Sequence, residues 1–104
     1  MLKISIHENE QAIEVTLSGR LAGPWVEELD RAWSETAPRL GNRSVQFDLR
    51  DLTYSDIAGK RVLRSIYAQT KAELIAGTLG SQQLAKEITE INDNGMKGVA
   101  HGTA

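Results

Sequence analysis

The chain is poor in the residues that build cross-links, metal sites and membrane spans. Of its 104 residues, none is cysteine, two are proline and one is phenylalanine. Without cysteine there is no disulfide, no thiol nucleophile and no thiolate-bound metal, which suits a reducing compartment. No apolar run approaches the ~18 residues of a membrane helix, and the first residues lack the apolar core of a secretion signal. We therefore expect a cytoplasmic protein.

An excess of charge of one sign is also missing. The formal net charge is -2 at pH 7, with 25% charged and 40% hydrophobic residues. A chain this close to neutrality offers no basic field for phosphate backbones, so we expect no nucleic-acid partner. Its length provides for one ordinary globular domain.

The hydrophobic pattern predicts an α/β domain. Apolar residues alternate over residues 2–6, 13–17 and 45–50, as in half-buried strands, and a fourth short strand is expected at 72–76. Helical spacing is found over residues 24–37 and 57–71, and again after a capping turn at 78–81. The order strand-strand-helix-strand-helix-strand-helix predicts a small mixed β-sheet with helices mainly on one face.

Two further expectations concern boundaries and faces. Residues 51–55 are expected to form a turn between the third strand and the second helix. Three glycines and no periodicity from Asn92 on predict a domain over residues 1–91 and a flexible tail over 92–104. The inner face of the second helix is expected to comprise Ala58, Val62, Leu63, Ile66, Tyr67 and Thr70.

The junction between the third strand and the second helix is the most informative part of the chain. In parallel α/β sheets, ligands and partners usually bind where a strand ends and a helix begins. Asp56 stands at the expected helix start and predicts an N-cap. Gly59 lies in the first helical turn at a cost of about 1 kcal/mol relative to alanine, so close packing or a close-approaching partner should offset it.

A further pattern at this junction is formed by Asp48, Leu49, Thr53, Asp56 and Gly59. In these positions the chain resembles the STAS family, the domain of sulfate transporters and anti-sigma factor antagonists. The glycine turn at residues 19–21 adds to the resemblance. The resemblance implies a STAS-like two-layer fold and a non-enzymatic regulatory module that binds a protein through the junction.

The resemblance also implies a partner and a set of contact residues. The partner would be an anti-sigma factor serine kinase or another component of a sigma pathway. In regulatory members a serine or threonine just before the glycine is phosphorylated, but this chain carries Ala58 there, so Ser55 or Thr53 would be the alternative phosphoacceptor. The implied contact residues are Thr53, Ser55, Asp56, Ile57, Ala58, Lys60, Arg61 and Arg64.

Other functions are less well supported by the residues. Asp48, Asp51 and Asp56 lie near one strand end, but spacing alone does not make a hard-cation site, so we expect no metal and no cofactor. No set of nucleophile, base and orienting residue is recognisable, so we expect no enzyme. The alternatives are a STAS domain that binds a nucleotide or lipid, a transporter accessory subunit, and a homodimer formed through the first strand if that strand is an exposed edge.

Overall fold

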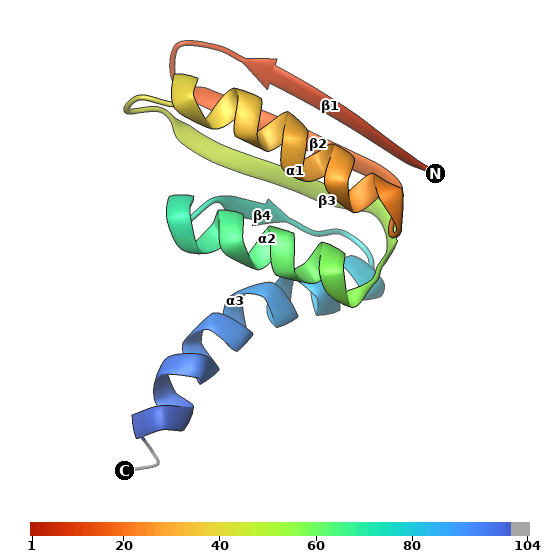
Figure 1. Ribbon diagram of the computed structural model, residues 1–104, viewed down its shortest axis with the longest axis vertical. Helices are drawn as coiled ribbons and strands as arrows, with labels where there is room; N and C mark the ends of the chain where they lie inside the picture. The colour runs from red at the N-terminus through yellow and green to blue at the C-terminus, as the bar shows by residue number, and fades with distance from the viewer. Residues whose placement is uncertain (101–104) are drawn as a thin grey trace.

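The structure, a computed structural model, is a four-stranded sheet in the order β1-β2-β3-β4 with helices packed against it (Figure 1). It describes the backbone of residues 1–100 and the side chains of residues 1–89. β1 is antiparallel to β2, whereas β2, β3 and β4 are parallel. The elements are β1 (Leu2–Glu8), β2 (Ala12–Leu21), α1 (Pro24–Thr36), the 3-10 helix η1 (Ala37–Arg39), β3 (Ser44–Ser55), α2 (Ile57–Thr70), β4 (Glu73–Ile75) and α3 (Leu79–Ala100).

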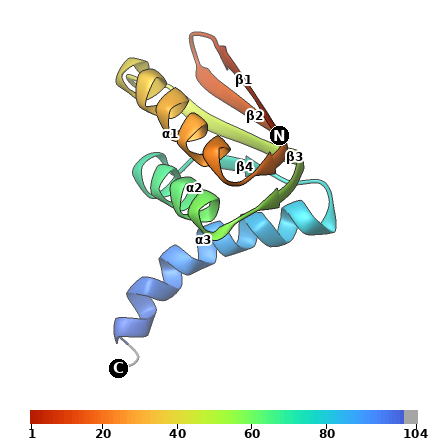
Figure 2. The ribbon, with the colours of Figure 1, turned by 45° about the vertical axis from the view of Figure 1, so that its right-hand side comes forward.

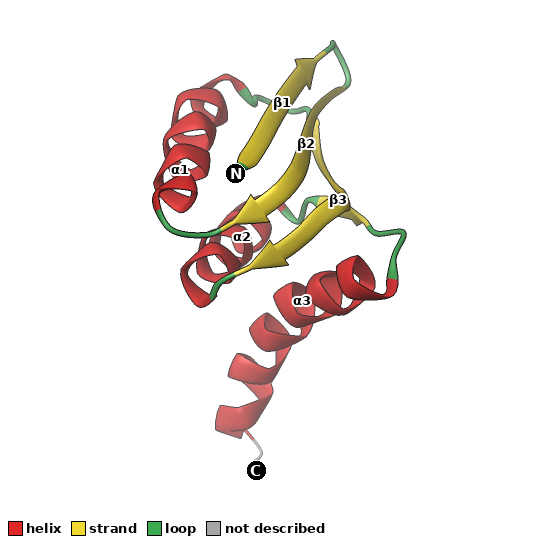
Figure 3. Ribbon diagram, turned by 90° about the vertical axis from the view of Figure 1, so that its right-hand side faces the viewer, coloured by secondary structure: helices red, strands yellow, loops and turns green. Residues whose placement is uncertain are grey.

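Helices α1 and α2 lie side by side on one face of the sheet, and α3 runs past its β3–β4 side (Figure 2). Right-handed crossovers between neighbouring parallel strands place their helices on the same face, which explains the layering. Figure 3 shows the other face of the strands without a helix over it. The predicted α/β class, with a mixed sheet and helices mainly on one face, is confirmed.

The core lies between the sheet and the two helices α1 and α2. Alternate residues of β2 and β3 are fully buried there, and the residues between them are polar and more exposed, as expected for a sheet with one covered face. The ring centroids of Trp33 and Phe47 lie 5.8 Å apart, which joins α1 to β3. The strand residues of this core are Ile13, Val15, Leu17, Val45, Phe47 and Leu49.

β3 is longer than the sequence pattern predicts. Residues 51–55 continue the strand instead of forming a turn. The pairing of β2 with β3 shifts register twice, between Thr16 and Ser18 and between Gly19 and Arg20. Each shift inserts an extra residue into β3. The buried side chains therefore stop alternating at every second position after Leu49, and the next buried residue is Leu52. The prediction of a turn was wrong, because a break in the alternation of apolar residues is also the sequence pattern of a strand end.

The buried face of α2 also differs in part from the expected one. Leu63 and Ile66 are buried as predicted, but Ala58 is exposed and Gly59 is buried in its place. The helix enters from an extended Asp56, which sets its rotation so that Gly59 meets the sheet. This rotation leaves Ala58 facing outward.

α3 reaches further along the chain than the expected domain boundary. Its backbone is helical to Ala100. The expected boundary at residue 91 stays a prediction. Side chains from residue 90 and the whole of residues 101–104 lie outside the described part, so the predicted flexibility of the tail stays a prediction. No helix within the described residues is both long and apolar enough to cross a membrane.

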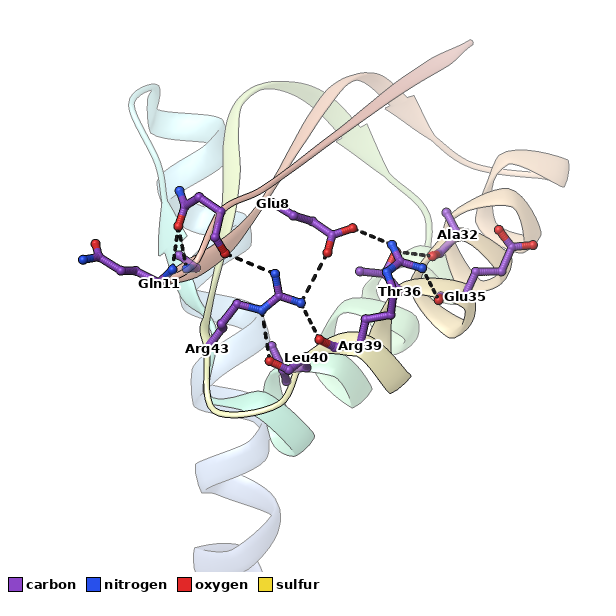
Figure 4. Close-up of polar contacts among 10 residues, drawn as sticks. Glu8, Gln11, Ala32, Glu35, Thr36, Arg39, Leu40 and Arg43 are labelled. Atoms are coloured by element: carbon purple, nitrogen blue, oxygen red, sulfur yellow. Dashed lines mark hydrogen bonds and ion pairs between the residues drawn. The ribbon is translucent and has the colours of Figure 1, made fainter.

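An ion-pair network closes the end of the sheet opposite the β3–α2 junction (Figure 4). The Glu8 carboxylate at the end of β1 accepts a hydrogen bond of 2.5 Å from Arg39, and Arg43 lies 3.3 Å away. Arg43 also donates to the backbone oxygens of Asn9 and Leu40. The network joins the β1–β2 turn to the segment before β3, two regions that are distant in sequence.

Replacing Glu8 with glutamine is expected to lower stability at neutral pH but not in acid. The hydrogen bond from Arg39 is the main cause that holds the pKa of Glu8 below its ordinary value. A lowered folded-state pKa gives stability that is present above the unfolded-state pKa and is lost as the pH falls through the folded-state pKa. Melting temperatures measured for both proteins should therefore differ at pH 7 and converge below the ordinary glutamate range, whereas a constant difference would contradict this account.

Candidate functional site

Asp56 caps helix α2 at the point where β3 ends. Its Oδ1 accepts from the backbone N–H of Gly59 at 2.7 Å, and its backbone is extended, as an N-cap requires. The predicted N-cap is confirmed. One of the N–H groups that the helix leaves without an internal partner is thereby satisfied.

The second carboxylate oxygen of Asp56 makes a contact that the sequence did not indicate. Oδ2 accepts from the backbone N–H of Gly23 at 3.1 Å, and the Asp56 N–H donates to the Leu21 carbonyl at 3.0 Å. Gly23 is the N-cap residue of α1, with a positive φ of 59°. One side chain thus ties together the starts of both helices on the covered face of the sheet.

Gly59 is required by close packing. A Cβ at this position would lie 2.5 Å from Ser55 Oγ and 2.8 Å from Leu21 Cγ. Contacts under 3.0 Å force neighbouring atoms to shift. Of the two explanations for this glycine, close helix–strand packing is the one that the contacts support.

The hydroxyl-bearing residues of the junction differ in accessibility. Ser55 is 8% exposed and its hydroxyl donates to the Asp56 carbonyl at 3.1 Å. Thr53 is exposed, and its hydroxyl donates to the Gly19 carbonyl at 2.9 Å. Ala58 is exposed and has no hydroxyl. An approaching protein therefore meets Thr53 and Ala58 directly and Ser55 only at its edge.

The three cationic residues at the start of α2 do not form one free patch. Lys60 lies 2.8 Å from Glu87 of α3, and both side chains are about one-third exposed. The hydrogen bond from Lys60 is the main cause that lowers the pKa of Glu87, with Arg64 adding a smaller attraction. Arg61 faces the α1–α2 side, where it lines a groove with Asp30. The predicted patch is divided between two sides of the helix.

A groove of about 240 Å³ opens between the end of β3, the start of α2 and the first turns of α3. Its apolar walls include Leu52, Tyr54 and Leu84, and the ion pair of Lys60 and Glu87 also borders it. The contribution of α3 was missed because nothing in the sequence pairs residues 80–87 with residues 52–60. The only sequence feature that could have suggested this contact is the negative charge of Glu87, which is opposite to that of Lys60.

Exposed apolar side chains lie on the three elements that form this groove, and Tyr54 lines the groove itself. Four large hydrophobic residues are exposed in the described part of the chain, and Tyr54 (44%), Ile57 (67%) and Leu79 (86%) belong to the elements that form the groove. The Arg20 guanidinium lies 4.4 Å from the ring centroid of Tyr54 and adds a positive charge beside it. The junction thus combines apolar contact area with a cationic rim, as in protein-binding surfaces.

The aspartates near the strand end do not converge. Asp48 is held by Arg50, whose guanidinium donates to both carboxylate oxygens at 3.0 and 2.8 Å. This hydrogen bonding is the main cause that lowers the pKa of Asp48. Asp56 is occupied by two backbone N–H groups, and no cluster of three potential metal ligands occurs among the described residues. Asp48 and Asp56 thus serve local structure, each with different partners.

The arrangement of strands and helices is shared with solved structures of known proteins. No protein-family model and no curated protein sequence matches the chain. An anti-sigma factor antagonist from Mycobacterium paratuberculosis superimposes with a TM-score of 0.71 at 13% identity, over 95% of this chain and 82% of that one.

Two further structures extend the likeness. The anti-sigma factor antagonist SpoIIAA in its unphosphorylated form has a TM-score of 0.65 at 11% identity, over 82% of this chain and 83% of its own. A protein from Shewanella loihica with a SpoIIAA-like fold has a TM-score of 0.55 at 12% identity, over 88% of this chain and 77% of its own. The chain therefore has the STAS-like fold of the anti-sigma factor antagonists.

Proposed function

We propose that the chain is a regulatory protein-interaction module that binds its partner through the β3–α2 junction. The observation that carries this proposal is the pair of exposed apolar residues at the junction, Tyr54 near the end of β3 and Ile57 at the start of α2. Burying them in a complex would contribute about 25 cal/mol for each Å² of apolar surface removed from water. Isolated exposed hydrophobic residues are common, but a group at the end of a parallel sheet is typical of a binding surface.

The proposed contact surface extends from Thr53 to Arg64. Ile57 and Ala58 provide its exposed centre, and Thr53 and Arg61 are exposed beside them. Lys60 and Arg64 are half-buried next to Glu87. Ser55 and Asp56 hold the shape of the surface through their internal hydrogen bonds. The fold shared with anti-sigma factor antagonists favours a component of a sigma pathway as the partner, and a serine kinase in particular.

In this proposal the module acts by binding alone, without catalysis and without a phosphate at residue 58. Alanine has no hydroxyl to accept a phosphoryl group, and Ala58 stands where the family pattern has serine or threonine. The buried hydroxyl of Ser55 is engaged with the backbone, which disfavours its modification. Thr53 is the more accessible of the two alternative acceptors. We place the module in the cytoplasm, where such pathways operate.

Incubation with the anti-sigma kinase of the native cell and ATP tests this proposal. Intact-mass spectrometry is expected to show binding of the kinase without addition of phosphate to this chain. A family member that carries serine at the acceptor position serves as the positive control for kinase activity. A stoichiometric phosphate on Thr53 or Ser55 would overturn the proposal of a module without a covalent switch.

A second candidate function rests on the groove beside α2. Its volume of about 240 Å³ is somewhat below the ~300 Å³ at which small-molecule sites begin. The groove has apolar walls and one ion pair, which suits part of a nucleotide or a lipid chain. Thermal shift assays with GTP and with fatty acids distinguish the candidates, because a partner-binding module should melt at the same temperature with and without them.

A further inference from the structure

Strand β1 forms a free edge of the sheet (Figure 1, Figure 3). It pairs with β2 in one unbroken register from Leu2 to Glu8. Natural edge strands are usually protected by a bulge, a proline, charged side chains or a covering segment. β1 has neither a bulge nor a proline along its seven residues, and its charged residues Lys3 and Glu8 lie near its two ends. Between them, Ile4 and Ile6 on its helical face are only half-buried.

The hydrogen bonds at both ends of β1 show which backbone groups are free. The Arg20 N–H donates to the Met1 carbonyl at 2.9 Å, and the Asn9 N–H donates to the Ala12 carbonyl at 3.0 Å. Residues directly opposite one another in an antiparallel ladder alternate between bonded and non-bonded pairs. Odd-numbered residues of β1 therefore bond to β2, and the N–H and C=O groups of even-numbered residues point outward. These even-numbered residues are Leu2, Ile4, Ile6 and Glu8.

We infer that β1 pairs antiparallel with β1 of a second copy of this chain, with the twofold axis at Ser5. This register overlaps the whole strand and places outward-facing residues opposite one another, Leu2 opposite Glu8 and Ile4 opposite Ile6 of the second copy. Their N–H and C=O groups then meet in bonded pairs. The result is a continuous eight-stranded sheet with α1 and α2 of both copies on one face, since a twofold axis perpendicular to the sheet keeps each face on its own side.

The side chains of β1 are compatible with this pairing. On the helical face, Ile4 and Ile6 of the two copies meet and cover each other's exposed apolar surface. The one charge on that face, Glu8, is already held by Arg39 and Arg43 within its own copy. On the open face, Lys3 lies opposite a histidine and Ser5 opposite Ser5, so no two lysines or carboxylates face each other.

The pairing leaves the β3–α2 junction free in both copies, because β2 separates β1 from β3. The inference therefore does not depend on the proposed function, and either can fail alone. An interface built from one edge strand is smaller than the standard ~800 Å² per partner, so the dimer is expected to be weak, with a dissociation constant in the micromolar range or above.

Sedimentation equilibrium combined with amide hydrogen exchange tests this inference. The dimer fraction is expected to rise between about 10 μM and 1 mM, with a rise in protection of the Ile4 and Ile6 amides over the same range. The amide of Ser5, which already bonds to β2, should change much less. A monomer at every concentration, or a dimer without protection of Ile4 and Ile6, would overturn the inference.

A matched pair of variants separates this interface from a general charge effect. Ser5→Asp places two carboxylates beside the twofold axis and is expected to raise the dissociation constant about fivefold. Ser18→Asp adds the same charge one strand further in, opposite Lys3 of its own copy, and is expected to leave dimerisation unchanged. Equal dissociation constants for the two variants would place any dimer interface elsewhere.

Discussion

Gly59→Ala is expected to lower the free energy of unfolding by about 2 kcal/mol. The added methyl group would overlap Ser55 Oγ and Leu21 Cγ, which lie 2.5 and 2.8 Å from the Cβ position. Overpacking of this kind costs up to about 3 kcal/mol, and the gain in helix propensity returns about 1 kcal/mol. Chemical denaturation of both proteins measures the difference.

The sign of this result separates the two explanations for the glycine. If Gly59 served only the close approach of a partner, alanine would stabilise the free protein by about 1 kcal/mol, through propensity alone. Ala68→Gly is a suitable control, because Ala68 is exposed on the same helix and should lose about 1 kcal/mol for propensity without any change in packing. A stabilised Gly59→Ala protein would contradict the packing explanation.

Asp56→Ala is expected to destabilise the protein by about 2 to 3 kcal/mol. The substitution removes the N-cap of α2, worth about 1 kcal/mol, together with the bond to the Gly23 N–H, at about 1.5 kcal/mol for a charged acceptor. Both helices on the covered face lose an anchor at once. Thermal unfolding and denaturant titration should agree on the size of the loss.

Asp56→Asn is the conservative control for this prediction. An asparagine oxygen can still accept from Gly59 N–H, but its amide nitrogen cannot accept from Gly23 N–H. We therefore expect a loss of about 1.5 kcal/mol, the contribution of the bond to Gly23 alone and smaller than the loss in the alanine variant. Equal losses for the two variants would show that the N-cap bond to the Gly59 N–H contributes nothing. Because Asp56 variants lower stability, a loss of partner binding in them could not be assigned to a lost contact, and they are poor probes of the docking surface.

The covered strands and helices were predictable because each carries a regular pattern of its own. Ile13, Val15 and Leu17 alternate without interruption, and Pro24 opens α1 as expected. The second half of β3 was not predictable, since two register shifts break the alternation after Leu49. A bulge leaves no distinct signal in a single sequence, because its extra residue looks like the start of a turn.

The candidate site was only partly predictable, for a related reason. The cap at Asp56 is a local feature, and a local rule identified it. Its bond to Gly23 and the pairing of Lys60 with Glu87 join residues far apart in the chain, and neither follows from spacing. The capping pattern at Asp56 was enough to predict where the site lies. The shape and the charges of the site depend on α3, which is distant in the sequence.

The most direct test of the docking surface compares three proteins as baits in the native cell: the unchanged chain, Ile57→Lys and Ala68→Lys. Ile57 is 67% exposed at the centre of the surface, and Ala68 is exposed near the other end of the same helix. Both variants should fold, because neither side chain is buried, and circular dichroism verifies this.

Quantitative mass spectrometry of the captured proteins then decides the matter. We expect one specific partner to be recovered equally by the unchanged chain and by Ala68→Lys, and to be reduced at least tenfold with Ile57→Lys, about 1.4 kcal/mol for an apolar contact replaced by a charge. Equal recovery of that partner by all three baits would contradict binding through the β3–α2 junction.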